Sequence, residues 1–268
     1  PTIESDIGDV TEAGNQDGGV SFDTTTSTNP GALIAGTAKA TGTMTASDSD
    51  DGEDVGEVNG LSFSGNDTGT YGSFTINAST GAWEYDLDNA DSDTQGLAEG
   101  ESATDQFTVT VTDDQGATAT ETVTITVNGT NDSPVIAGTA TGSVTEEDLG
   151  DVVTTTGQLT SSDVDVLGQT ATWSISPNSP GGAYGTLGVD GNGLWTYTLN
   201  AAAADGLTAG ETATEVFTVR VTDDNQAWDD QEVTITVTGT NDGPTIESDI
   251  GDVTEAGNQD GGVSFDTT

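Results

Sequence analysis

The stretch Phe107-Thr108-Val109-Thr110-Val111-Thr112-Asp113-Asp114 places an apolar side chain at every second position, with a threonine after each one. This period of two gives an extended chain one buried face and one polar face, and β-branched residues favour the pleated surface of a sheet. Thr122-Val123-Thr124-Ile125-Thr126-Val127 repeats the pattern beyond a turn at Asp113-Asp114-Gln115-Gly116. The two runs predict a β-hairpin, and the short strands elsewhere predict an all-β fold of sandwich type.

The same strand and the segment that follows it occur twice in the chain. Phe217-Thr218-Val219-Arg220-Val221-Thr222-Asp223-Asp224 lies 110 residues after the first run. Gly239-Thr240-Asn241-Asp242-Gly243-Pro244 lies at the same interval after Gly129-Thr130-Asn131-Asp132-Ser133-Pro134. Residues 244–268 repeat residues 1–25 without a change. Internal repeats of this length indicate a string of domains that each fold alone.

We therefore predict one domain over residues 1–133, called unit one, and a second over 134–243, called unit two. Residues 244–268 are expected to be the truncated start of a third repeat. Unit one has 19 more residues between Glu12 and Asp48 than unit two has between Glu146 and Asp163. This difference predicts an insertion near 13–42, most simply a hairpin that decorates the sandwich.

Matching aromatic residues mark the expected core of each unit. These are Trp83, Tyr85 and Phe107 in unit one, with Trp195, Tyr197 and Phe217 in unit two. The only helical signal is a short turn over 200–207, where four alanines are consecutive. Gln226 replaces Gly116 in the second hairpin turn, so we expect that turn to differ from the first.

Composition excludes several classes of function. The chain has 47 acidic and 2 basic residues, a formal net charge of −45, and neither histidine nor cysteine. Such a surface repels nucleic acid and anionic lipid, and no apolar run is long enough for a membrane helix. Ser-His and Cys-His catalysis, disulfides and metal sites with nitrogen or sulfur ligands are also excluded. Oxygen ligands remain in quantity, and these suit hard cations.

Many acids recur at matching positions, mostly in expected loops. The set in unit one is Glu12, Asp48, Asp50, Glu101, Asp113 and Asp132, and the set in unit two is Glu146, Asp163, Asp165, Glu211, Asp223 and Asp242. Two carboxylates 4 Å apart repel by about 4 kcal/mol at an effective dielectric constant of 20. Clustered acids must therefore take up protons or a cation from solution. Ca²⁺ accepts six to eight oxygens in flexible geometry and ranks first, and Mg²⁺ ranks second.

Four strings form a set that can be compared with known repeats: Leu87-Asp88-Asn89-Ala90-Asp91, Ala98-Glu99-Gly100-Glu101, Thr108-Val109-Thr110-Val111-Thr112-Asp113 and Gly129-Thr130-Asn131-Asp132-Ser133-Pro134. Over both units the chain resembles the VCBS repeat of large bacterial surface adhesins. More distantly it is similar to cadherin repeats, which are Greek-key sandwiches with calcium between successive domains. The resemblance implies tandem Ig-like, cadherin-like sandwiches.

The cadherin linker, Asp-x-Asn-Asp-x-x-Pro, resembles the last of these strings, with Gly129 in place of the first Asp and the proline one residue earlier. The resemblance implies Ca²⁺ at the junction of the two units, held by Glu12, Glu101, Asn131, Asp132, Asp163, Asp165 and Asp223. It implies a second junction after unit two with Glu146, Glu211, Asn241 and Asp242. Asp48, Asp50 and Asp113 would face a preceding unit.

The resemblance also implies a function. Calcium would stiffen these spacer repeats of an extracellular adhesin on the bacterial cell surface, which would support adhesion and biofilm formation by holding a distal ligand-binding domain away from the cell. Neighbouring repeats would be the main partners. Three alternatives stay open: a glycan- or protein-binding module that acts through the insertion or Trp228, a calcium store without defined sites, and a merely solvated acidic surface. No enzyme is expected, because the acids lie in turns rather than in an evident cleft.

Overall fold

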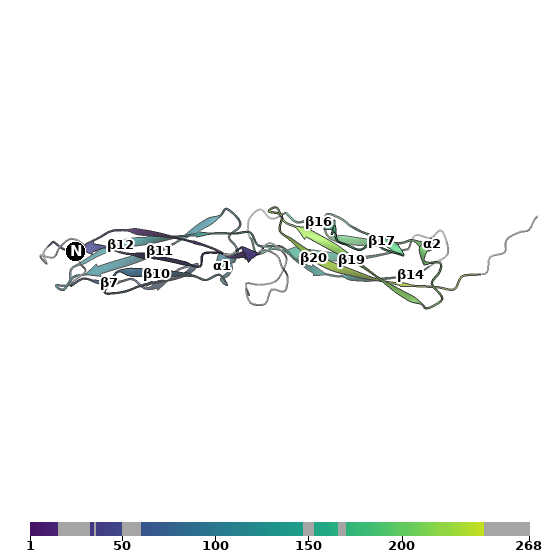
Figure 1. The fold of residues 1–268 in the computed structure, drawn as a ribbon, viewed down its shortest axis with the longest axis horizontal. Helices are drawn as coiled ribbons and strands as arrows, with labels where there is room; N and C mark the ends of the chain where they lie inside the picture. The colour runs from purple at the N-terminus through teal and green to yellow at the C-terminus, as the bar shows by residue number, and fades with distance from the viewer. Residues whose placement is uncertain (16–32, 35, 50–59, 147–152, 166–169, 244–268) are drawn as a thin grey trace, which may run out of the picture.

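The structure is a computed structural model that describes residues 1–15, 33–34, 36–49, 60–146, 153–165 and 170–243. Its sheets form two groups that follow the order of the sequence, and Figure 1 shows these groups end to end along one long axis. Asp50, most of the predicted insertion and residues 244–268 lie outside the described residues. The predicted unit bounds stay predictions.

Unit one is a sandwich of two four-stranded sheets. The first sheet has the order β2 (Asp6–Thr11), β12 (Thr118–Asn128), β11 (Ser102–Thr112) and β7 (Ser62–Ser64). The second has the order β5 (Lys39–Thr43), β10 (Ala82–Leu87), β9 (Gly72–Ile76) and β8 (Asp67–Thr68). Short pairs join β1 (Thr2–Ile3) to β6 (Ala46–Ser47) and β3 (Gly14–Asn15) to β4 (Leu33–Ile34), and α1 spans Ser92–Gln95.

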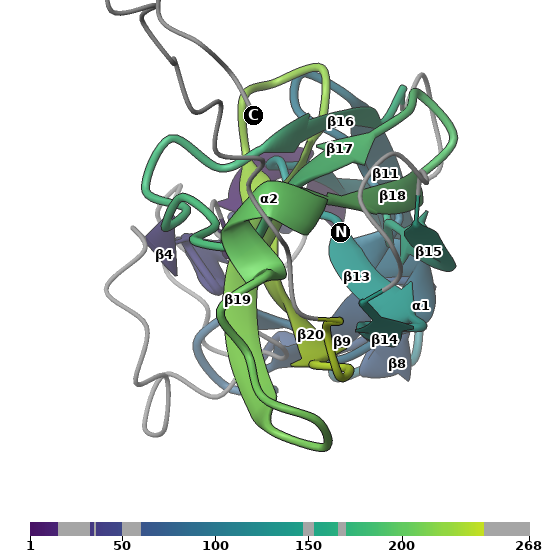
Figure 2. The same cartoon turned by 90° about the vertical axis from the view of Figure 1, so that its right-hand side faces the viewer.

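Unit two repeats this architecture, with α2 (Ala201–Ala204) in front in the end-on view of Figure 2. Its first sheet has the order β14 (Thr141–Thr145), β20 (Trp228–Thr238), β19 (Thr212–Thr222) and β16 (Thr172–Ile175). Its second has the order β13 (Val135–Gly138), β15 (Thr154–Ser162), β18 (Leu194–Leu199) and β17 (Gly185–Val189). The predicted all-β, tandem sandwich fold is confirmed.

Burial along the strands follows the alternation in the sequence. Phe107, Val109 and Val111 of β11 are buried, whereas Thr108 between them is exposed. All six predicted aromatic anchors are buried, and Phe107 stacks on Phe74 with ring centroids 4.8 Å apart. Each such side chain contributes roughly 1.5–3 kcal/mol by leaving water. The apolar faces therefore stabilise both sandwiches despite the low apolar content of the chain.

The hairpin turns differ from one expectation. Gln226 has φ +76°, close to the φ of +87° at Gly116, so the predicted difference between the two turns is wrong. Asp113 Oδ1 accepts from Ala117 N at 2.7 Å, and Asp223 Oδ1 accepts from Ala227 N at 2.8 Å. The same aspartate bond thus closes both turns, with or without glycine. The short helix α2 lies where the alanines predicted it, and α1 was not predicted.

Strand direction places the loops at two distinct ends of each unit. β2 runs parallel to β12, and β14 runs parallel to β20. Parallel strands finish at the same edge, so the residue after the first strand meets the linker that follows the last strand. We call this the trailing end of a unit. Each β-hairpin turn lies at the opposite end, the leading end, because the hairpin strands are antiparallel.

Candidate metal site at the junction of the two units

The linker between the units is buried although it is polar. Residues 130–133 are all buried, which is unusual for a connecting segment. Gly129 precedes them where a Cβ would lie 2.2 Å from the backbone oxygen of Leu97. That close approach explains why glycine stands at the position of the first cadherin Asp.

Direct hydrogen bonds join the linker to unit two. Asn131 Nδ2 donates to Asp223 Oδ2 at 2.8 Å, and Asn225 Nδ2 donates to Asn131 Oδ1 at 2.7 Å. The backbone N–H of Asp132 donates to Asp165 Oδ2 at 3.0 Å. The leading end of unit two is therefore held against the trailing end of unit one.

Unit one contributes Glu12, which directly follows β2 and is 0% exposed. Gln95 Nε2 from α1 donates to Glu12 Oε1 at 2.7 Å, whereas Oε2 accepts no hydrogen bond from the described residues. Burial, and then the charges of Asp132 and Asp165, raise the pKa of Glu12 to about 8. A buried carboxylate oxygen without a donor indicates a missing cation or proton.

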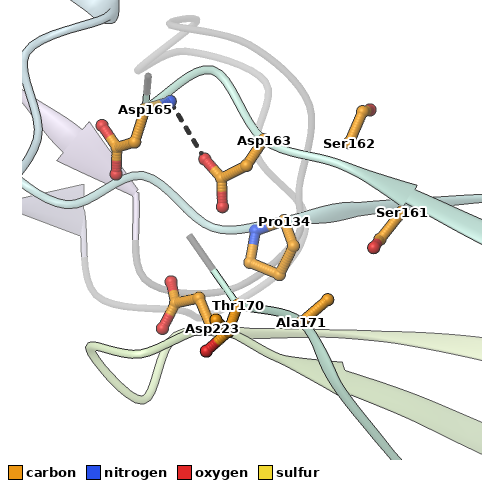
Figure 3. A pocket seen from close by; sticks show the side chains of 8 residues that line it. All are labelled: Pro134, Ser161, Ser162, Asp163, Asp165, Thr170, Ala171 and Asp223. Atoms are coloured by element: carbon orange, nitrogen blue, oxygen red, sulfur yellow. Dashed lines mark hydrogen bonds between the residues drawn. The ribbon is translucent and has the colours of Figure 1, made fainter. Parts of the chain in front are cut away.

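Unit two contributes Asp163, Asp165 and Asp223, whose side chains line the pocket shown in Figure 3. Asp165 N donates to Asp163 Oδ1 at 3.1 Å, whereas Asp163 Oδ2 is buried and accepts no hydrogen bond from the described residues. Burial, and then the charges of Asp132, Asp163 and Asp223, raise the pKa of Asp165 to about 7. Burial also raises the pKa of Asp163.

No basic side chain is left to neutralise this cluster. The chain has only two such residues. Lys39 binds Glu84 and Asp86, each at 2.6 Å, and Arg220 binds Asp230 at 2.8 Å. The groups that could bind a metal at the junction are carboxylate and amide oxygens. Two of these oxygens, Glu12 Oε2 and Asp163 Oδ2, are buried and accept no hydrogen bond from the described residues. This donor set fits a hard divalent cation such as Ca²⁺.

Comparison with known families agrees with this architecture. The profile of the bacterial cadherin-like domain matches residues 1–129 and again residues 131–239. The chain belongs to the bacterial cadherin-like domain family. Domains of this kind generally bind Ca²⁺, associate with neighbouring repeats and are typically non-enzymatic. The more specific VCBS resemblance is not established by this match.

Solved cadherin ectodomains are similar to the chain at low sequence identity. Drosophila N-cadherin EC1-4 is 18% identical with a TM-score of 0.41, over 67% of this chain and 42% of that one. Mouse cadherin-23 EC22-24 is 16% identical with a TM-score of 0.41, over 89% of this chain and 64% of that one. The chain thus spans less than two thirds of the length of either. A search of curated proteins gave no match.

Two predicted metal ligands of this cadherin-like chain, Glu101 and Glu211, form hydrogen bonds within their own turns. Glu101 Oε2 accepts from Ala98 N at 3.1 Å, and Glu211 Oε2 accepts from Thr208 N at 3.0 Å, so each closes its own turn. Hydrogen bonds from Thr208 also lower the pKa of the exposed Glu211. Neither glutamate belongs to an acidic cluster of the described residues.

Two other predicted ligands lie at the leading end of unit one. Asp48 Oδ2 lies 3.4 Å from the amino nitrogen of Pro1, and Asp113 caps its own hairpin turn. Asp50, the third predicted ligand of this group, is outside the described residues.

The trailing end of unit two holds a second acidic group. Glu146, Asp205 and Asp242 each offer a carboxylate oxygen within 4.8 Å of the others, and Asn241 donates to the backbone oxygen of Asp242 at 3.2 Å. Asp205 was not predicted as a ligand, and neither Gln95 nor Asn225 was predicted to lie at the junction. Position 205 follows position 95 by the repeat interval of 110 residues, a signal that was present in the sequence.

No helix among the described residues is long and apolar enough to cross a membrane.

Proposed function

We propose that the two units are calcium-rigidified spacer repeats of a large bacterial adhesin that acts outside the cell. Tandem cadherin-like domains suggest an extracellular, adhesion-type spacer role. The observation that supports calcium is the proximity of Glu12 and Asp132 of unit one to Asp165 of unit two. In addition, Glu12 Oε2 and Asp163 Oδ2 are buried and accept no hydrogen bond from the described residues. The VCBS assignment, the unit bounds and the predicted ligand set belong to this proposal.

The residues of the chain would act by fixing the angle between two rigid bodies. Asn131 and Asn225 hold the linker to unit two, and Glu12 and Asp163 present buried oxygens from opposite sides. A bound Ca²⁺ would supply the positive charge that these carboxylates lack. Without it, repulsion between buried acids favours separation of the units. With it, the string becomes a rod that holds a distal binding domain away from the cell and supports adhesion and biofilm formation.

Thermal unfolding and small-angle scattering, each with Ca²⁺ and with chelator, test the proposal. Calcium should raise the melting temperature by more than about 10 °C and give a longer, narrower particle, because binding to the folded state adds to stability. Magnesium is the matched control and should have a smaller effect, because it loses its water reluctantly. A chain whose shape and melting are indifferent to chelator would exclude calcium rigidification.

The alternative of a glycan-binding loop at Trp228 has less support. Trp228 is half-buried at the start of β20, and the guanidinium of Arg220 covers its ring at 3.4 Å from the centroid. Arg220 is held in turn by Asp230 through two bonds of 2.8 Å. One ring face is thus already occupied by a cation. The insertion lies largely outside the described residues, so a role in ligand binding there stays a prediction.

A further inference from the structure

The two trailing ends are built alike. The backbone N–H of Glu12 donates to Asn128 O at 2.9 Å, and that of Glu146 donates to Thr238 O at 2.8 Å. The two acceptors are 110 residues apart in the sequence. Asp132 and Asp242, separated by the same interval, supply the second carboxylate at each end.

A third position completes each set and differs between the units. Gln95 N donates to Asp91 O at 3.0 Å, and Asp205 N donates to Ala201 O at 2.9 Å, so both donor and acceptor keep the 110-residue interval. The same backbone position therefore carries a neutral amide in unit one and a carboxylate in unit two.

The side chains of Gln95 and Asp205 differ in how they interact with the buried glutamate of their own unit. Gln95 donates to Glu12 Oε1 at 2.7 Å and leaves Oε2 without a hydrogen bond from the described residues. In unit two, Asp205 brings a third carboxylate to within 4.8 Å of Glu146 and Asp242. Glu146 is only 2% exposed, and its one side-chain hydrogen bond among the described residues comes from Thr240 N at 3.2 Å.

We propose that the residue at positions 95 and 205 sets the calcium affinity of its own trailing end. Asp205 is an added ligand in unit two, and Gln95 is a neutral positioning residue that orients Glu12. The affinity of oxygen-ligand calcium sites rises with the number of charged ligands. The inference rests on the proposed function and adds a residue that controls it.

One consequence concerns the longer array. A longer array built from copies of both units would contain two kinds of trailing end. Its joints then take up calcium at two different concentrations, and stiffening proceeds in two steps rather than one.

Calcium titration of the whole 268-residue chain, followed by the amide NMR signals of Thr130 and Thr240, tests this inference. Thr240 N donates to Glu146 Oε2, and the backbone N–H of Thr130 lowers the pKa of the Glu12 carboxylate. Each amide signal therefore reports on one trailing end. Gln95→Glu should shift the Thr130 midpoint to a calcium concentration lower by on the order of tenfold and leave Thr240 unchanged. Asp205→Asn, which relieves repulsion and so preserves folding, should shift the Thr240 midpoint upward by a similar factor and leave Thr130 unchanged.

Ser92→Glu is the matched control, because Ser92 is exposed on the same helix as Gln95. An equal shift in Ser92→Glu and Gln95→Glu would overturn the inference, since total charge alone would then explain the effect. An unchanged Thr240 midpoint in Asp205→Asn would also overturn it. In that case the proposed function would still stand if both amides of the wild-type chain responded to calcium. A wild-type chain in which neither amide responds to calcium would overturn both.

Discussion

At the level of single residues, the buried acids of the junction govern the response to pH. Burial and neighbouring charges raise the pKa of Glu12 from its ordinary value of 4.5 to about 8, and that of Asp165 from 3.8 to about 7. In the absence of metal, the folded chain therefore keeps protons that the unfolded chain has already released. The state that binds more protons gains stability as the pH falls.

In chelator, we expect the melting temperature to fall as the pH rises from about 5 to about 8, because this window lies between the unfolded and folded pKa values of Glu12. Saturating Ca²⁺ should reverse the slope, since the ion and the protons compete for the same oxygens. Scanning calorimetry at a series of pH values measures both. Glu12→Gln is the control and should flatten the chelator curve. A wild-type curve that rises with pH in chelator would contradict the assignment.

At the level of elements, the hairpin turn between β19 and β20 keeps a backbone shape that favours glycine. Gln226 has φ +76°, in the left-handed region where a side chain is strained. Asp223 closes this turn and also accepts from Asn131 of the linker, so one side chain serves the hairpin and the junction together. The strain is therefore located beside the proposed calcium site.

Gln226→Gly should raise the free energy of unfolding of unit two by about 0.5–1 kcal/mol, because glycine adopts positive φ without a steric cost. Calcium affinity should not change, since the Gln226 side chain is not among the predicted ligands. Urea unfolding and calcium titration of the same variant separate the two effects. The matched change Gly116→Ala in unit one should destabilise that unit instead. A loss of stability in Gln226→Gly would show that its side chain makes a contact that outweighs the strain.

At the level of the whole molecule, shape depends on the contact between two sandwiches that each have a core of their own. The buried apolar residues form one cluster per unit. Among the described residues, polar contacts such as the hydrogen bonds of Asn131 and Asp165 join the two units. The units should therefore stay folded when the junction is loosened, and the angle between them should vary.

Asp163→Asn combined with Asp165→Asn should remove the calcium-dependent lengthening seen by small-angle scattering, because it removes two of the charges that face the linker. Unit one should unfold as in the wild-type chain, which the amide signals of its core report during a urea titration. Asp48→Asn is the matched control at the leading end of unit one and should leave the shape unchanged. A rod of wild-type length in the double variant with calcium would place the stiffness elsewhere, for example in the Asn131 and Asn225 bonds.

Much of the fold could be predicted because it depends on local pattern. The alternation in β11 and β12, the six aromatic anchors and the short helix α2 follow from side-chain period, size and propensity, and all are observed. The second hairpin turn was predicted wrongly, because an aspartate bond holds Gln226 in a conformation that residue preference alone disfavours. Helix α1 was missed since it is a single turn, although its Asp91 cap, which accepts from Asp93 N, is a recognisable start signal.

The sequence alone was enough to indicate the repeated units, the period-two strands and a large negative charge carried by carboxylate oxygens, because these depend on neighbours and composition. Which acids meet was decided by strand pairing between distant segments. The parallel pairing of β2 with β12 brings Glu12 to the linker after Asn128, and the contact with unit two adds Asp163, Asp165 and Asp223. Glu101 and Glu211, which motif spacing also indicated, bind their own turns, while Asp205 joins a cluster that no motif included. A cation site is a property of three-dimensional proximity, and in this chain proximity is set by folding across more than a hundred residues.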